Sequence, residues 1–291
     1  MSQAATSNDT VSSTAKVMTG IRVLETEREI SCEQDVCSSD VPRLFSDPMA
    51  RHMLEQEDLN LAWDKFENQT GYIKAMRIFT LRTRFHDDAI TDHPEVKQIV
   101  ILGAGLDARA YRLPSLTKEM KLWEVDTPEM IEYKSKKFLA AGDKGIDIEP
   151  KSQRFSIQTN LATSSWRDEL CGPGSAFKKD IPTVWILEGF VYYLPPDSAL
   201  ELMRNIDELS APGSVWAGDI MSEKLTNDST QSWSAMWQFG CNDPESWLKS
   251  FGWNDVIANS LEETAKKYTG YDGMVKYPGE PGQYWFVLAK R

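Results

Sequence analysis

The residues best suited to chemistry are two glycines and an acid at the ends of apolar runs. Gly103 and Gly105 come directly after the apolar residues 99–102. Glycines at this place let the backbone come close to a ligand, and the helix that follows begins with unpaired N–H groups that attract anions. Asp126 comes about 20 residues later, where nucleotide-binding α/β domains carry an acid that binds the ribose hydroxyls. The spacing predicts a nucleotide site.

Apolar runs that alternate with helical patterns must position these residues. We expect strands, in chain order, at residues 99–102, 121–126, 154–158, 182–187, 214–220 and 283–289. Strands joined through helices pair in parallel and bind ligands beyond their carboxyl ends. Glu188 and Asp219 are further acids at such ends. The pattern predicts an α/β fold with a mostly parallel sheet, closed by an antiparallel strand at the C-terminus.

The chain has 291 residues and shows no linker that would divide it, so we expect one domain over residues 16–291. A Ser/Thr/Asn-rich start predicts a disordered tail. From the N-terminus the expected segments are a tail at 1–15, a helical cap at 16–95, a cofactor-binding core at 96–220, a Trp-rich substrate lid at 221–265 and C-terminal strands at 266–291.

Composition excludes several classes of partner. The net charge of −12 argues against nucleic acid and against a polybasic membrane surface, since both require basic residues. The four cysteines form no CxxC pair and the chain has three histidines, so we expect no metal site. No stretch approaches the ~20 apolar residues of a membrane span. We expect a soluble, cytoplasmic protein that acts on a small molecule; its oligomeric state stays open.

Three kinds of nucleotide protein compete for the glycine turn. A P-loop NTPase is excluded because the GxxxxGK[ST] loop is absent. A dehydrogenase remains open, since Ala108 at the third glycine position is tolerated in the dinucleotide fingerprint. An S-adenosylmethionine methyltransferase is favoured, because its turn is typically shorter and followed closely by an acid, here Asp107.

The turn and its surroundings resemble the leucine carboxyl methyltransferase family, in its bacterial and fungal branch. The resemblance covers about residues 15–220 and is carried by Leu44–Ala50, Arg82–Asp88, Leu102–Pro114, Trp123–Pro128 and Trp185–Leu194. It implies a Rossmann-like class I methyltransferase with a seven-stranded sheet and S-adenosylmethionine as cofactor. The region after Ser222 matches much less.

The resemblance also implies roles for individual residues. Arg84, with Arg82 as second choice, would pair with the cofactor's carboxylate, Asp126 would bind the ribose, and Glu188 would meet the ammonium group. Asn160 stands where the family has Asp, and would bind the adenine. The implied cofactor-binding set is Arg82, Arg84, Gly103, Ala104, Gly105, Asp107, Glu124, Val125, Asp126, Asn160, Leu161, Glu188 and Gly189.

On the acceptor side the resemblance implies Tyr192 and Tyr193, and the Trp-rich segment adds Trp233 and Trp237 as candidate substrate contacts. The two tyrosines, with Arg109, are the candidate catalytic residues, although core packing is an almost equal interpretation for the tyrosines. Arg109 and Arg112 either brace the sheet or attract an anionic substrate. The tryptophans either form a lid or cover the sheet edge.

Methyl transfer from a sulfonium is an in-line displacement. A carboxylate acceptor is already ionised at neutral pH, because its ordinary pKa is ~4, and it needs no general base. We therefore expect methyl esterification of a small organic acid, aromatic acids included. A hydroxyl or nitrogen acceptor would need a base, with His86, His93 and the tyrosines as candidates. Methylation of a protein's C-terminal leucine, which is the family's best-known activity, stays open, as does a non-catalytic cofactor-binding protein.

Overall fold

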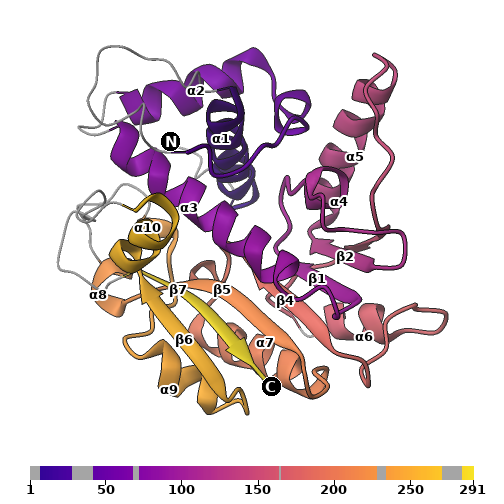
Figure 1. The fold of residues 1–291 in the computed structure, drawn as a ribbon, viewed down its shortest axis with the longest axis vertical. Coiled ribbons are helices and arrows are strands. Elements are labelled where there is room, and N and C mark those ends of the chain that lie inside the picture. Colours follow the sequence, from indigo (N-terminus) through magenta and orange to yellow (C-terminus); the bar gives the residue numbers. More distant parts are fainter. Residues whose placement is uncertain (1–6, 28–41, 68–71, 164, 228–233, 271–283) are drawn as a thin grey trace, which may run out of the picture.

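The computed structural model describes residues 7–27, 42–67, 72–163, 165–227, 234–270 and 284–291 (Figure 1). Its centre is one seven-stranded sheet in the order β3-β2-β1-β4-β5-β7-β6. The strands are β1 Gln98–Leu102, β2 Lys121–Asp126, β3 Gln153–Gln158, β4 Thr183–Leu187, β5 Val215–Met221, β6 Asp255–Ser260 and β7 Tyr284–Lys290. β7 runs antiparallel to both β5 and β6, and the pairs among β1–β5 are parallel. The predicted fold class is confirmed.

Helices cover both faces of the sheet. The first face carries α3 Tyr72–Thr91, α4 Arg109–Arg112, α5 Pro128–Gly142 and α10 Leu261–Thr269, and the second carries α6 Ser165–Cys171, α7 Pro196–Glu208 and α9 Pro244–Lys249. β1 shows why both are covered: Ile99 and Ile101 belong to the first core cluster, Val100 and Leu102 to the second. A strand that is apolar on both sides is stable only between two layers.

Before the sheet, the chain forms helices, of which α3 crosses the first face while α1 and α2 pack against α3 (Figure 1). They are α1 Ser7–Glu27, the short η1 Ala50–Met53, α2 Gln56–Glu67 and α3. The expected disordered tail over residues 1–15 is wrong from residue 7, because α1 begins there. The sequence pattern is misleading since α1 is polar at its start, while its later residues Val17, Ile21 and Val23 are buried against neighbouring elements.

The expected lid over residues 221–265 is corrected in its second half. Residues 244–260 form α9 and β6, which belong to the sheet and its cover. Trp253 is fully buried, and Trp247 and Phe251 pack on the second core cluster, so these aromatic residues cover the sheet. The C-terminal segment 266–291 likewise contains only one described strand, β7, after the end of α10.

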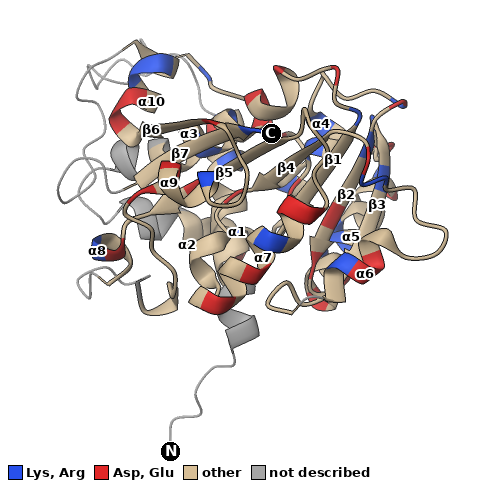
Figure 2. Ribbon diagram, turned by 90° about the horizontal axis from the view of Figure 1, so that it is seen from below, with Lys and Arg blue, Asp and Glu red and all other residues tan. Residues whose placement is uncertain are grey.

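The remaining short elements are η2 Val191–Tyr193, α8 Glu223–Thr226 and η3 Ser234–Met236. Figure 2 shows acidic and basic residues interspersed along the ribbon in that view. Among the described residues, no helix combines the length and the apolar character that a membrane crossing requires.

Candidate functional site

The glycine turn adopts a backbone conformation that side chains would disturb. Gly103 and Gly105 have φ of 70° and 49°. A Cβ on Gly103 would lie 2.5 Å from the ring of Phe190, so only glycine fits there. A Cβ on Gly105 would meet only Ala15 of α1 within 4 Å, at 3.7 Å. The turn therefore presents its backbone to a space that α1 borders, as a cradle for a ligand requires.

Asp126 links the end of β2 to this turn. One carboxylate oxygen accepts from the N–H of Gly105 at 2.6 Å, and the other accepts from the N–H of Thr127 at 2.7 Å. Burial raises the pKa of Asp126, and these two hydrogen bonds oppose the shift. Because a carboxylate has about four acceptor positions, it can still accept from two ribose hydroxyls.

Glu188, directly after the end of β4, is 13% exposed and lies between two arginines. It accepts from Arg109 Nη2 at 2.6 Å, from Arg82 Nε at 3.4 Å and from Thr83 Oγ1 at 3.1 Å. Burial alone would raise the pKa of Glu188, but Arg109, His86 and Arg82 hold it well below the usual range. The cation that this carboxylate requires is thus supplied by the protein, and a ligand ammonium would be an additional donor.

The surroundings of the two arginines of α3 favour Arg82, the second choice from the sequence, as the site residue. Arg82 is 8% exposed; its Nη1 lies 3.2 Å from the hydroxyl of Tyr192, and a Cβ on Gly189 would lie 2.7 Å from the same nitrogen. Arg84 is 41% exposed and bonds to Asp88 and to the carbonyl of Leu44, so its guanidinium has other partners than Glu188 and Gly189. Residues two positions apart lie on nearly opposite sides of a helix, so only one of them can face the sheet.

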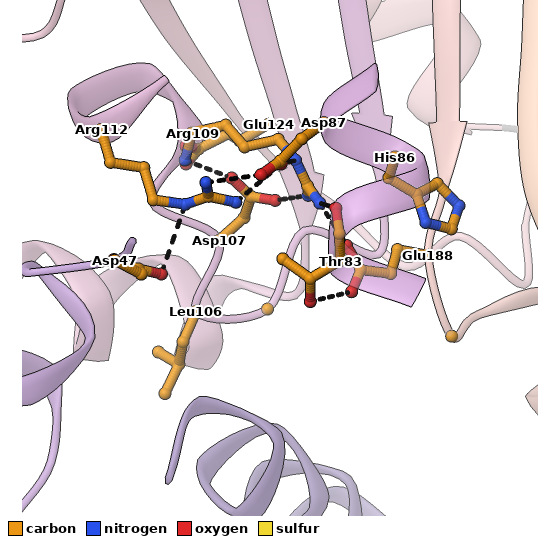
Figure 3. Close-up of polar contacts among 12 residues, drawn as sticks. Asp47, Thr83, His86, Asp87, Leu106, Asp107, Arg109, Arg112, Glu124 and Glu188 are labelled. Atoms are coloured by element: carbon orange, nitrogen blue, oxygen red, sulfur yellow. Dashed lines mark hydrogen bonds and ion pairs between the residues drawn. The ribbon is translucent and has the colours of Figure 1, made fainter. Parts of the chain in front are cut away.

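A network of buried ion pairs, which we call the arginine network, lies beside the glycine turn (Figure 3). It consists of Asp47, Asp87, Asp107, Arg109 and Arg112. Arg109 is fully buried and bonds to both Asp87 and Asp107 as well as to Glu188. Arg112 binds both oxygens of Asp87 at 2.7 Å.

The arginine network bears on the roles expected for three residues. Arg109, a candidate catalytic residue, is buried, and its guanidinium is directed at three carboxylates of the protein, which favours the bracing role. Arg112 is likewise a brace. Asp107 accepts from the N–H of Arg109 at 2.6 Å and from its guanidinium, so it orders the turn and is not presented to a ligand.

Two predicted cofactor residues of β2 face the protein interior. Glu124 is fully buried and pairs with Lys134 at 2.8 Å and Arg154 at 2.6 Å. The side chain of Val125 is in the second core cluster, and its carbonyl accepts from the N–H groups of Gly103 and Ala104. Alternation along a strand sends consecutive side chains to opposite faces, where helices cover them, so both side chains are directed into the protein.

The end of β3 is partly as expected. Asn160 is exposed, and its side-chain oxygen accepts from the N–H of Ala162 at 2.9 Å. Leu161 is buried in the second core cluster, so only its backbone can line a ligand site. Asn160 therefore remains the predicted adenine contact on this strand.

Three aromatic residues meet beside Arg82, and we call them the aromatic corner: Tyr192, Tyr193 and Trp237. The ring centroids of Tyr192 and Tyr193 are 5.0 Å apart. The ring of Trp237 lies edge-on to that of Tyr192, with 5.9 Å between their centroids. The segment after η3 is bound to η2, since the N–H of Gln238 donates to the carbonyl of Tyr192 at 2.7 Å. Trp233 lies outside the described residues.

Neither candidate histidine base is presented to a ligand. His86 is fully buried, its Nδ1 lies 2.8 Å from the carbonyl of Arg82, and burial lowers its pKa. His93 is buried with its Nδ1 2.9 Å from the carbonyl of Ala89. Both rings bond the preceding helical turn and are structural.

Sequence reasoning assigned no role to two residues that help to build the site. Arg22 of α1 donates to the carbonyl of Leu106 at 2.6 Å and pairs with Asp47 at 2.9 Å, so α1 is fastened to the glycine turn. No motif could have indicated this contact. Asp219 accepts from the N–H of Gly189 at 2.6 Å. Its place at a strand end is visible in the sequence, but its partners are not.

Comparison of the sequence with known proteins identifies the family of this chain. The model of the leucine carboxyl methyltransferase family matches residues 29–207, more than half of the chain. A protein of Mycolicibacterium gilvum, named as an S-adenosyl-L-methionine-dependent methyltransferase, is 35% identical over 251 residues, which cover 78% of each chain. A protein of Mycobacterium tuberculosis with the same name is 29% identical over 270 residues, 86% of this chain and 82% of the relative.

Solved structures support the fold. A DUF574 family protein from Streptomyces avermitilis has a TM-score of 0.58 at 11% identity, covering 96% of this chain and 97% of that one. A protein from Thermobifida fusca, titled as a methyltransferase, has a TM-score of 0.50 at 16% identity, covering 84% and 93%. The glycine turn with Asp126, Glu188 and Arg82 fits a methyl donor with a ribose, an ammonium and a carboxylate. The chain belongs to the leucine carboxyl methyltransferase family and is an S-adenosylmethionine-dependent methyltransferase.

Proposed function

We propose that the enzyme transfers the methyl group to the carboxylate of a small organic acid and forms a methyl ester. The observation that carries this proposal is the burial of the candidate bases: His86 and Tyr192 are buried, and Tyr193 is partly buried. Burial also raises the pKa of Tyr192 well above its usual range and raises that of Tyr193, so both hydroxyls keep their protons, and it lowers the pKa of His86. None of these three described residues combines exposure to a ligand with a pKa that lets it accept a proton near neutral pH. An acceptor that arrives ionised needs no such group.

The cofactor's place is part of the proposal. The turn Gly103–Gly105 would line the methionine portion, with Arg82 donating to its carboxylate and Glu188 accepting from its ammonium group. Asp126 would accept from the ribose and Asn160 would bond to the adenine. This arrangement places an opposite charge, which the protein already orients, at the carboxylate and at the ammonium group of the ligand, and this limits the cost of desolvating those two groups.

Bound S-adenosylmethionine supplies a methyl group on a positively charged sulfur. In the proposed reaction a carboxylate oxygen attacks the methyl carbon, the carbon–sulfur bond breaks, and the electron pair stays on sulfur, so no proton moves. The protein's contribution is alignment and exclusion of water; well-oriented intramolecular reactions suggest that ~7–11 kcal/mol is available from such positioning.

The aromatic corner supports an apolar acceptor, aromatic acids included. Tyr193 and Trp237 are partly buried and pack on the first core cluster, so their remaining surface could cover an apolar ring. An acid with an apolar body matches this corner.

A product screen tests the proposal. The enzyme would be incubated with S-adenosylmethionine and matched sets of acids, alcohols, phenols and amines that share one carbon skeleton, with a peptide ending in leucine included. Mass spectrometry should find methylated acids, and mild alkali should release methanol from them, because esters hydrolyse and ethers do not. Methylation of phenols or amines alone would contradict the proposal, and methylation of the peptide alone would replace the small molecule by a protein C-terminus.

The pH dependence of turnover provides a second test. With a carboxylate acceptor of pKa ~4, kcat should be nearly constant from weakly acidic to weakly basic pH, because the nucleophile is already ionised. A phenol acceptor, with a pKa of ~10, should instead give a rate that rises with pH across this range.

A further inference from the structure

Asp219, near the carboxyl end of β5, is a buried acid that the proposed reaction does not use. It is fully buried. One oxygen accepts from the N–H of Gly189 at 2.6 Å. The other accepts from the hydroxyl of Tyr284 at 2.6 Å and lies 3.8 Å from Arg82 Nη1. A buried carboxylate is costly unless its oxygens are bonded, so these partners fix its orientation.

Tyr284 reaches this acid because β7 is antiparallel. Tyr284 pairs across the sheet with Met221, so the first residue of β7 lies at the carboxyl end of β5. A parallel strand would bring its last residue to this edge instead. Tyr284 is 2% exposed, and burial raises its pKa well above the usual range, so its hydroxyl stays protonated and donates to Asp219.

The same carboxylate acts on two parts of the site. Through Gly189 it holds the backbone directly after Glu188. Through its other oxygen it attracts the guanidinium of Arg82, which also contacts the hydroxyl of Tyr192 and the carboxylate of Glu188. Arg82 is a long side chain with considerable rotamer freedom, and several fixed partners are needed to hold it in one orientation.

We infer that Asp219 and Tyr284 are positioning residues, which orient Arg82 and Gly189 for the methionine end of the cofactor. Tyr284 fixes Asp219, and Asp219 fixes the guanidinium and the strand end. This inference rests on the proposed role of Arg82 in holding the cofactor's carboxylate. It extends the site to the last strand of the sheet.

The variant Tyr284→Phe tests the inference, because it removes only the hydroxyl. Calorimetry would compare S-adenosylhomocysteine with 5′-methylthioadenosine, which lacks the amino and carboxylate groups. Losing one buried hydrogen bond to a charged group should weaken S-adenosylhomocysteine binding about tenfold. Binding of 5′-methylthioadenosine should change by less than about twofold, within the usual effect of a distant site.

Matched variants separate the outcomes. Tyr133→Phe removes a hydroxyl on α5 that donates to the carbonyl of Met53 at 3.0 Å, and should leave both affinities unchanged. Equal weakening of both ligands by Tyr284→Phe would show a general structural role and overturn the inference, as would unchanged binding of both. Asp219→Asn, which keeps the shape of the side chain, repeats the test should Tyr284→Phe fold poorly.

The variant Arg82→Ala separates a failure of this inference from a failure of the proposed role of Arg82, on which the inference rests. If Arg82→Ala weakens S-adenosylhomocysteine selectively and Tyr284→Phe does not, the inference fails while the role of Arg82 stands. If Arg82→Ala does not discriminate between the two ligands, the proposed role of Arg82 itself fails. In the double variant the two losses should be smaller than additive, since both act through one guanidinium.

Discussion

The arginine network and the aromatic corner lie on two sides of Glu188 and are built on different physical principles. In the network, five charged side chains satisfy one another in the protein interior, and each carboxylate has more than one bonded partner. In the corner, three rings meet through edge and tilted contacts, and the segment after η3 is attached through backbone hydrogen bonds to η2.

This difference indicates which part of the site has a fixed side-chain geometry. Buried charges impose strict geometry, because a group that loses its partner keeps the full cost of desolvation. Ring contacts tolerate changes of shape more easily. We therefore expect the network to determine whether the cofactor side forms at all, and the corner to determine which acceptor is used. The following predictions test this division.

The largest effect is expected from Arg109→Ala. The change leaves Asp87, Asp107 and Glu188 without a shared cation in a buried place, and breaking such a pair typically costs ~3–5 kcal/mol. Denaturant unfolding should show a loss of this size. The control Lys118→Ala breaks a solvent-exposed pair with Glu149 and should cost no more than ~1 kcal/mol. Similar losses of unfolding free energy in the two variants would mean that burial does not make the ion pairs of the network stronger than an exposed pair.

Arg82→Ala and Arg84→Ala should differ in cofactor affinity. Arg82 faces Glu188 and Gly189, and losing its charged hydrogen bond to a carboxylate should weaken S-adenosylhomocysteine binding ~10- to 100-fold. Arg84 faces Asp88 and should change the affinity by about twofold at most, as exposed pairs contribute little. Calorimetric titration measures both, and the reverse order would restore Arg84 to the site.

Trp237→Ala should change the acceptor rather than the cofactor. The change removes a ring that, under the proposed function, contacts the acceptor; a ring contact of ~0.5–1.5 kcal/mol corresponds to a ~2- to 10-fold rise in KM for the acceptor, while cofactor affinity should stay constant. Trp247→Ala is the matched control, since that ring packs on Phe239 and Phe251 in the cover of the sheet's second face. It should lower stability and leave the acceptor KM unchanged. A change in cofactor affinity in Trp237→Ala would contradict the division of tasks between the two regions.

The smallest effect concerns the acid side of the pH–stability curve. The pKa of Glu188 is lowered in the folded protein, so the carboxylate stabilises the fold at neutral pH and this contribution declines as pH falls below the unfolded pKa and towards the folded one. In Glu188→Gln, the loss of unfolding free energy between about pH 6 and pH 4 should be smaller by up to ~1 kcal/mol. An unchanged slope would contradict the lowered pKa.

Local patterns in the sequence are sufficient for the fold and for the residues at strand ends. The apolar runs predict β1 and β4 because a strand covered on both faces is apolar along most of its length. Gly103, Gly105 and Asp126 are predictable because the turn and the acid lie within one strand–helix–strand unit, where spacing in sequence fixes proximity in space. The prediction misses β6, since its exposed and half-buried residues lack a strand's apolar run and fall within the expected aromatic lid.

The sequence by itself determined the class of fold, the glycine turn and the acids at strand ends. Only the tertiary structure decided that Arg82 and not Arg84 faces the site, that Arg109 pairs with three carboxylates, and that Tyr284 reaches Asp219. The physical reason is the distance along the chain over which each effect acts. Periodicity and turn chemistry are local, whereas the partner of a charged side chain depends on which distant elements pack beside it, and a shift of two residues along a helix reverses the direction in which it points.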